Sequence, residues 1–233
     1  MIDRMSLRLS AALLLAGQLL YIVVTQFHAG GDANDHPAIF AKYAASGSWK
    51  AVHVAQFASA AILLAGLLAL FFALDAQDGP ARWAGRFGAA SAVVALGLYG
   101  VLQAVDGVGN KQVDHAWVSA PQAQKAARFA SAEAMRWLEW GVRSYLDFAL
   151  GLALLLLAAA VVWTAGVPRP IAYLIGLSGL TYLVQGGVVG SEGFSGTHTI
   201  LIIVAWVVSV AWMIWLVVVA WQMQDSGGPS PAA

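Results

Sequence analysis

The chain has 233 residues, of which 60% are apolar and 10% are charged, against roughly 25% charged in an ordinary soluble domain. Twelve basic residues balance twelve acidic ones without any block of like charge, which excludes a nucleic-acid binder. The high apolar content excludes a disordered chain. The chain has no cysteine, which excludes disulfides, thiolate metal sites and cysteine nucleophiles. This composition is typical of a membrane protein and excludes a soluble enzyme.

Six apolar runs are long enough to cross a hydrocarbon core of about 30 Å, which takes about 20 helical residues. Backbone polar groups in lipid must be satisfied internally, and the runs lack strand alternation, so each is predicted to be a helix. The fold class is therefore all-α, a bundle of six transmembrane helices. In chain order the runs are Leu9–Phe27, Ala51–Leu74, Ala84–Val105, Tyr145–Thr164, Ile171–Val189 and Thr199–Gln222.

The two ends of the chain need separate treatment. Arg4 and Arg8 before an apolar run are also found in signal peptides, but this run is longer than a signal core, so a membrane helix is expected. Residues 1–224 are predicted to form one integral membrane domain. Residues 225–233, rich in Ser, Gly and Pro, are predicted to be a disordered tail.

Two long connections carry helix-start signals. Asp35 and Pro37 predict a short helix to about Ala45, with an apolar side that suits the headgroup region of the membrane. A second loop, Gly107–Ala120, is followed by helical composition that continues to about Trp163. That fourth helix is longer than a bilayer is thick. Its charged first half is therefore expected to extend outside the bilayer or to line a wet cavity.

The positive charges near the helix ends predict an orientation. With the N-terminus in the cytoplasm, the short inner connections hold as many Lys and Arg residues as the longer outer loops, so their positive density is higher. We therefore predict a protein of the inner (cytoplasmic) membrane with both termini in the cytoplasm. The inner residues are Arg4, Arg8, Arg82, Arg86 and Arg169.

Polar side chains recur on one face of several predicted helices. In the first helix, Gln18, Tyr21, Thr25 and His28 are spaced by three or four residues, which keeps them on one face. In the long fourth helix, five charged residues fall within an arc of roughly 120°. All five histidines lie toward one side of the membrane. The five charged residues are Glu133, Arg136, Glu139, Arg143 and Asp147.

Two interpretations of these polar faces stay open. They could be interhelical hydrogen bonds and ion pairs that only hold the bundle together. Alternatively they form a polar, charged cavity in the outer half of the bundle, which we favour because five of the predicted helices place a polar face at the same depth. Such a cavity is expected to bind a small molecule or a metal ion. The lipid bilayer is the other expected partner, and no nucleic acid is expected.

The first candidate chemistry is a divalent transition metal held by imidazole and carboxylate groups. The predicted metal ligands are His28, His53 and His198. Their spacing matches no established metal-binding signature. Haem between His53 and His198 is a less favoured alternative.

The second candidate is acid catalysis on an apolar substrate, in which a buried carboxylic acid delivers a proton. The predicted catalytic acids are Glu139, Asp106 and Glu133. The predicted substrate-binding residues are Arg136, Arg143, Trp140, Tyr99 and Gln103. Whether the protein is an enzyme stays open, because a small carrier, a proton-coupled transporter or an accessory membrane subunit would carry similar charges.

Several segments resemble those of a widespread group of bacterial multi-pass membrane proteins of similar length, described only as a domain of unknown function. The segments read HPAIFAKYAASGSWKAVHVAQF, AVDGVGNKQVDHAW, RWLEWG, VPRPIAYLIGLSG and GFSG. The resemblance implies a multi-pass helical fold. It implies no activity, cofactor or site residue.

Overall fold

The computed structural model describes residues 2–74 and 78–223, so the predicted tail, 225–233, lies outside the described residues. Within these residues the fold is all-helical, without strands. Two short segments, the π-helix η1 (Ala104–Asn110) and the 3-10 helix η2 (Gln122–Gln124), join longer helices. The α-helices are α1 (Arg4–Thr25), α2 (His36–Ala45), α3 (Trp49–Leu74), α4 (Gly79–Gln103), α5 (Lys111–Val118), α6 (Lys125–Trp163), α7 (Arg169–Glu192) and α8 (Gly196–Gln222).

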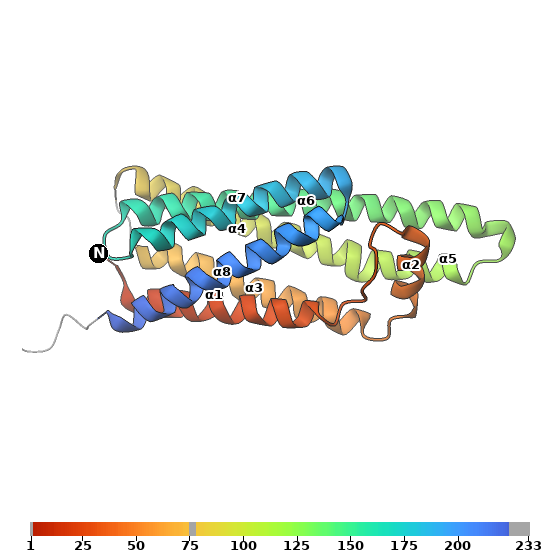
Figure 1. Cartoon of the computed structure of the whole chain (residues 1–233), viewed down its shortest axis with the longest axis horizontal. Helices are drawn as coiled ribbons and strands as arrows, with labels where there is room; N and C mark the ends of the chain where they lie inside the picture. The colour runs from red at the N-terminus through yellow and green to blue at the C-terminus, as the bar shows by residue number, and fades with distance from the viewer. Residues whose placement is uncertain (1, 75–77, 224–233) are drawn as a thin grey trace, which may run out of the picture.

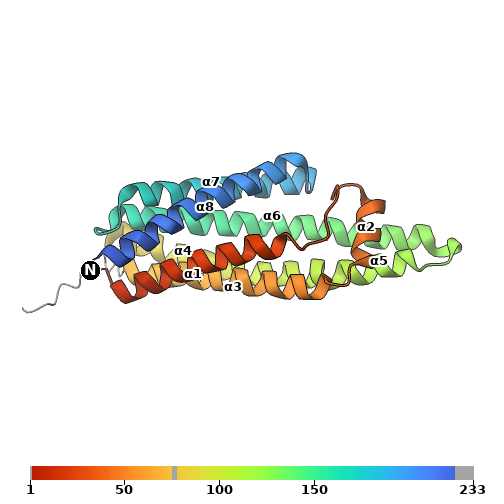
Figure 2. The same ribbon diagram turned by 60° about the horizontal axis from the view of Figure 1, so that its bottom comes forward.

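Six helical segments are long and apolar enough to cross a membrane, and they lie side by side in an elongated bundle (Figures 1 and 2). They are α1, α3, α4 continued through η1 and α5, α6 with η2, α7 and α8. The predicted six-helix architecture is therefore confirmed, and it is that of a multi-pass membrane protein. We call the end of the bundle that carries the N-terminus the proximal end and the opposite end, which carries α2 and α5, the distal end (Figure 1).

The proximal half has a dry core of large aliphatic side chains. Leu7 of α1, Leu70 of α3 and Leu157 of α6 are fully buried there. Apolar side chains also cover the outside of the bundle, where Phe72 and Val207 are about two-thirds exposed. An apolar exterior around a packed core is what contact with lipid requires.

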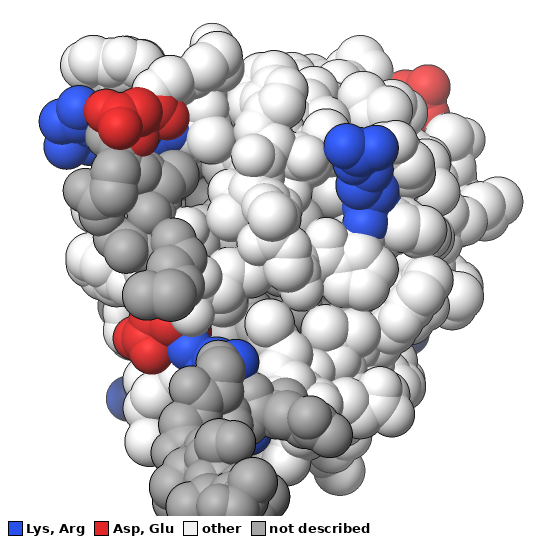
Figure 3. Space-filling model, turned by 90° about the vertical axis from the view of Figure 1, so that its left-hand side faces the viewer, with Lys and Arg blue, Asp and Glu red and all other residues white. Residues whose placement is uncertain are grey.

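Few charged side chains lie at the proximal end. Figure 3 views this end and shows a few separate Lys, Arg, Asp and Glu side chains among the described residues, with uncharged surface between them. The helices that begin near this end contribute arginines there, which are Arg4 and Arg8 of α1, Arg82 and Arg86 of α4, and Arg169 of α7.

Two glycines allow α6 and α7 to approach closely. A Cβ atom on Gly151 would lie 2.7 Å from the carbonyl oxygen of Gly179, and one on Gly179 would lie 2.8 Å from the carbonyl oxygen of Gly151. These distances are shorter than side chains tolerate, so both positions need glycine. Small residues at helix contacts are a standard device of membrane bundles.

Gly151→Ala should therefore destabilise the bundle by about 1–3 kcal/mol, because the added methyl group meets backbone that cannot move aside. Gly176→Ala on α7 is the matched control, since its Cβ would lie 3.6 Å from Ala158, an ordinary contact. Thermal unfolding in detergent should show a lower midpoint for Gly151→Ala and little change for Gly176→Ala. Equal midpoints for the two variants would contradict this packing.

The prediction of a loop at Gly107–Ala120 is wrong over most of its length. The helix of α4 continues through the π-helix η1 into α5, so that only the turn around Ser119 and Pro121 is irregular. A π-helix accommodates an extra residue per turn without breaking the helical hydrogen bonding. The glycines and polar residues that suggested a loop therefore lie on a continuous helix.

Beyond the other helices, α5 and the first part of α6 project from the distal end (Figure 1). At about 1.5 Å per residue, the 39 residues of α6 exceed the thickness of a hydrocarbon core. Ile39, Phe40 and Tyr43, the apolar side of α2 for which the sequence predicts a headgroup setting, are buried in a small core with Trp49 of α3 and Ala132 of α6. This side of α2 therefore packs against other helices of the protein.

Lys111 fixes the carboxyl end of α2. Its Nζ donates hydrogen bonds to the carbonyl oxygens of Tyr43, Ala44 and Ser46, at 2.7 to 2.8 Å. A cation at the carboxyl end of a helix also interacts favourably with the helix dipole. The segment that covers the distal end of the bundle is therefore tied to the α4–η1–α5 helix.

Candidate functional site

A cavity of about 330 Å³ lies in the distal half of the bundle. Its wall takes residues from the carboxyl-terminal part of α1, the amino-terminal parts of α3 and α8, and the middle of α6. Among the lining residues, Gly30 and Gly31 in the loop after α1 and Thr199 at the start of α8 are exposed. Its volume is at the lower end of the range for small-molecule sites, about 300–1,000 Å³.

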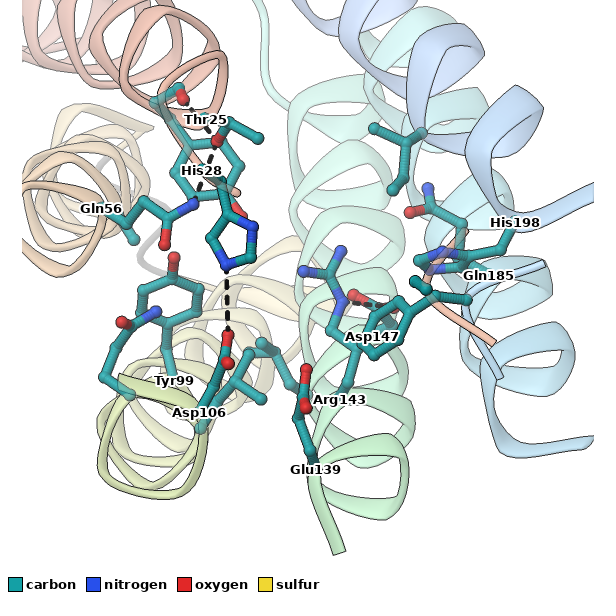
Figure 4. A pocket seen from close by; sticks show the side chains of 18 of the residues that line it. Thr25, His28, Gln56, Tyr99, Asp106, Glu139, Arg143, Asp147, Gln185 and His198 are labelled. Atoms are coloured by element: carbon teal, nitrogen blue, oxygen red, sulfur yellow. Dashed lines mark hydrogen bonds and ion pairs between the residues drawn. The ribbon is translucent and has the colours of Figure 1, made fainter. Parts of the chain in front are cut away.

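Three side chains from different elements meet at the edge of this cavity, and two of them, His28 and Asp106, belong to its wall. His28 follows the end of α1, His53 lies in the second turn of α3, and Asp106 lies on the π-helix η1. Nε2 of His53 lies 3.1 Å from Oδ2 of Asp106, and Nε2 of His28 lies 3.9 Å from the same oxygen. One ligand atom from each residue lies within 4.8 Å of the other two, and Figure 4 shows His28 turned toward Asp106.

Backbone carbonyl groups determine which nitrogen of each neutral histidine ring carries the hydrogen. Nδ1 of His53 lies 2.7 Å from the carbonyl oxygen of Trp49, and Nδ1 of His28 lies 3.2 Å from that of Ala29. A carbonyl oxygen can only accept, so each Nδ1 carries the hydrogen and each Nε2 of a neutral ring presents a lone pair. When both rings are neutral, two ring lone pairs and a carboxylate oxygen therefore face one another, whereas a proton on Nε2 of His53 gives an ion pair with Asp106.

The three facing atoms are close enough together that one metal ion could bind all of them. One proton can settle the contact of Asp106 with only one of the two rings, whereas one metal ion can ligate all three atoms. In a tetrahedral site with bonds of about 2.0–2.2 Å, ligand atoms lie about 3.3 Å apart. Here the two histidine nitrogens lie 3.1 and 3.9 Å from the Asp106 oxygen, and all three atoms lie within 4.8 Å of one another. Hydrogen bonds from Nδ1 to a carbonyl group are the usual outer support of metal-binding histidines.

Neighbouring residues hold this group in place. Gly107 gives His53 room, because a Cβ at residue 107 would lie 2.9 Å from Cβ of His53. The carbonyl oxygen of Gly107 accepts a hydrogen bond from Nε1 of Trp49 at 3.0 Å. Asn110 donates from Nδ2 to Oδ1 of Asp106 at 3.2 Å, which leaves Oδ2 directed at the histidines. Sequence reasoning missed Asn110, because it placed this residue in a loop.

Glu139 is connected to Asp106 through the side-chain amide of Asn110. Nδ2 of Asn110 lies 2.6 Å from Oε2 of Glu139, which also accepts from Nη1 of Arg136 at 2.6 Å. Nη2 of Arg136 donates to the carbonyl oxygen of Ala33 in the loop after α1. Both partners of this ion pair are buried. A continuous polar chain thus leads from Arg136 to Asp106.

A second ion pair lies further along α6. Nε of Arg143 donates to Oδ2 of Asp147 at 3.0 Å, and Asp147 is buried. Figure 4 shows the guanidinium group of Arg143 between the His28 side and the His198 side of the cavity. His198 and Gln185 lie on the wall opposite His28 and Asp106 (Figure 4).

The structure therefore gathers most, but not all, of the predicted site residues around the cavity. Predicted residues in its wall are His28, Tyr99, Gln103, Asp106, Arg136, Glu139, Arg143 and His198. His53 reaches it through Asp106, while His198 is not part of the group of three potential metal ligands. Glu133 pairs with His36 at 3.1 Å, and the ring of Trp140 packs against His36 and close to Gly193, so neither lines the cavity.

Burial lowers the pKa of the His28 imidazole below its ordinary value, and the carboxylate of Asp106 opposes this only in part. In metal-free protein, the NMR signals of the His28 ring, assigned with a His28→Gln variant, should titrate with a midpoint below about 6.5. The unfolded chain then takes up this proton at a higher pH than the folded chain. His28 therefore lowers the free energy of unfolding as the pH falls below about 6.5, where the unfolded chain becomes protonated first. A midpoint above it would contradict the burial of this ring.

Comparison of the chain with protein-family models, with curated proteins and with solved structures finds no match. The family resemblance of the segments quoted above thus has no matching model. Function has to be argued from the geometry of the site.

Proposed function

We propose that this membrane protein binds one divalent transition metal ion through His28, His53 and Asp106 and uses it in a reaction on a small molecule held in the cavity. The observation that carries the proposal is the convergence of two imidazole Nε2 atoms on one carboxylate oxygen, with each Nδ1 in contact with a carbonyl group. Two histidines and a carboxylate form a donor set that suits zinc, iron and other first-row metals.

Three protein ligands leave coordination positions open, which distinguishes catalytic sites from closed structural ones. Here the open side faces the cavity, because His28 and Asp106 both belong to its wall. A metal in such a site polarises a bound oxygen or lowers the pKa of a bound water. Glu139 is the candidate proton acceptor, because its carboxylate belongs to the cavity wall together with Asp106.

Haem between His53 and His198 is not part of the proposal. Nε2 of His53 faces Asp106 at 3.1 Å, and His198 lies across the cavity from His28 and Asp106. A carrier is not favoured either, because the cavity is confined to the distal half and the buried leucines of the proximal half, Leu7, Leu70 and Leu157 among them, form a packed core. The orientation predicted from positive charges would place the cavity at the outer side of the cytoplasmic membrane.

Metal content tests the proposal directly. After loading with Zn²⁺, Co²⁺ or Mn²⁺ and removal of the excess, the purified protein should retain about one metal ion per chain, measured by elemental analysis. A His28→Ala/His53→Ala double variant should retain none, because only one of the three ligands remains. His115→Ala is the matched control, since His115 is exposed on α5 and outside the group. Wild-type retention no higher than that of the double variant would refute the site.

A further inference from the structure

We propose that the cavity binds a small amphiphilic carboxylate, an organic monoanion with an apolar body, whose carboxylate group lies on the terminal nitrogens of Arg143. This inference names the substrate class of the proposed metal site, and it rests on that function for the charge of the ligand and for the dependence of binding on metal. It is carried by the free hydrogen-bond donors in the cavity wall, by the charges there and by the apolar part of the lining.

Arg143 offers a donor pair that the protein itself does not use. Its Nε binds Asp147, while Nη1 and Nη2 have no hydrogen-bond partner among residues 2–74 and 78–223. In Figure 4 these terminal nitrogens point into the space between His28 and Gln185. Because the buried carboxylate of Asp147 holds the guanidinium group in place, its planar fork is preorganised for two hydrogen bonds to a carboxylate.

Arg136 cannot play this role. Its Nη1 and Nη2 already bind Glu139 and the carbonyl oxygen of Ala33, and its guanidinium group lies 4.7 Å from the centre of the Phe194 ring. Arg143 is thus the arginine of the cavity wall with unused terminal donors among the described residues.

Other polar atoms of the wall also lack partners. Nε2 of Gln18, Oε1 of Gln185 and Nε2 of His198 are buried and make no hydrogen bond within the described part of the chain. All three residues line the cavity and are at most 1% exposed. Buried polar groups are costly without partners, so their presence indicates a cavity built for polar atoms of a ligand or for ordered water.

The charges of the wall limit the ligand to a single negative charge. Three carboxylates face two guanidinium groups, which gives the metal-free cavity a formal charge of minus one when all five groups are ionised and the histidines are neutral. A divalent ion bound to His28, His53 and Asp106 changes this to one net positive charge. A monoanion then neutralises the cavity, whereas a phosphate dianion would leave it negative. The residues counted are Asp106, Glu139, Asp147, Arg136 and Arg143.

The remainder of the wall suits an apolar body. It is formed by aliphatic and aromatic side chains from five of the spanning helices, among them Leu63, Leu102, Leu146, Ile202, Trp206 and Tyr182. The volume of about 330 Å³ corresponds to roughly ten water molecules at about 30 Å³ each. This is enough for a short-chain or aromatic carboxylate and too little for a complete phospholipid.

Binding of radiolabelled hexanoate to the full chain in lipid nanodiscs tests the inference, with empty nanodiscs subtracted. Hexan-1-ol and inorganic phosphate are the competing probes. For zinc-loaded protein we expect hexanoate to bind at least 10-fold more tightly than to metal-free protein, and neither competitor to displace it at equal concentration. Displacement by hexan-1-ol would show a merely apolar cavity, and displacement by phosphate would show a phosphate site. Either result overturns the proposal.

Two variants locate the anion. Arg143→Lys keeps the charge beside Asp147 but removes the fork, and it should weaken hexanoate binding at least 10-fold. Arg143→Leu/Asp147→Leu removes both charges without leaving one unpaired, and it should abolish the binding. Arg86→Lys, on an exposed arginine of α4, is the matched control and should bind normally. Unchanged binding in both Arg143 variants would overturn the proposal.

Failure of the metal site would be visible separately. If elemental analysis finds no bound metal, the proposed function fails, while the effect of Arg143→Lys on hexanoate can still be measured in the metal-free protein. If metal binds and hexanoate does not, the carboxylate inference alone fails.

Discussion

Asp106→Asn is expected to weaken metal binding by at least about 100-fold, since loss of even an outer-shell partner costs 10–100-fold. The same variant should be at least as stable as the wild type when both are metal-free. The amide nitrogen of the new side chain can donate to Nε2 of His53, which lies 3.1 Å from Oδ2 of Asp106. Its oxygen can still accept from Nδ2 of Asn110, now at 3.2 Å from Oδ1.

Thermal unfolding with and without Zn²⁺ separates the two effects. A ligand present at 100 times its Kd stabilises a protein by about 2.7 kcal/mol, so zinc should raise the unfolding midpoint of the wild type and not that of Asp106→Asn. Asp114→Asn is the matched control, because Asp114 is a buried acid of α5 outside the group. An equal response of wild type and Asp106→Asn to zinc would show that Asp106 is not a ligand.

The second large effect is expected at the other ion pair of α6. Arg143→Leu should destabilise the bundle by about 3–5 kcal/mol, because it leaves the buried carboxylate of Asp147 without its cation. Arg143→Leu/Asp147→Leu should recover most of this loss, since replacing a complete buried pair by apolar side chains is often neutral.

Unfolding midpoints of the single and double variants in detergent measure the difference. Size-exclusion chromatography of each variant checks that the protein remains monodisperse. If Arg143→Leu unfolds at the same midpoint as the wild type, the two side chains do not depend on each other in the folded state.

The fold was largely predictable because lipid imposes length and hydrophobicity on each spanning helix. Each of the six predicted runs overlaps a helix of the structure. What failed was the segment after Val105, where Gly107, Gly109 and Asn110 suggest a loop. Residues that usually predict a turn do not predict one inside a π-helix. A search for periodicity at 3.6 residues per turn does not detect a π-helix either.

The candidate site was predictable only in part. The spacing of Gln18, Tyr21, Thr25 and His28 places them on one face, and all four line the cavity. Helical periodicity gives the face of one helix but not its axial position relative to the next. The sequence therefore could not show that Asp106, rather than His198, completes the group with His28 and His53.

The charged face of α6 illustrates the same limit. Five charges on one face predict burial, and Arg136, Glu139 and Asp147 are buried. The partners depend on neighbouring helices and loops: Glu133 pairs with His36 and Glu139 with Asn110. These contacts join residues 29 to 97 positions apart, which no local pattern encodes.

X-ray absorption spectroscopy of the zinc-loaded wild-type protein tests the metal site most directly. We predict a first shell of two imidazole nitrogens at about 2.0–2.1 Å and oxygen from Asp106 and solvent at about 2.0–2.2 Å. The imidazole contribution should be lost in His28→Ala/His53→Ala. A first shell made only of oxygen, with no scattering from imidazole rings, would contradict a metal centre at this cavity.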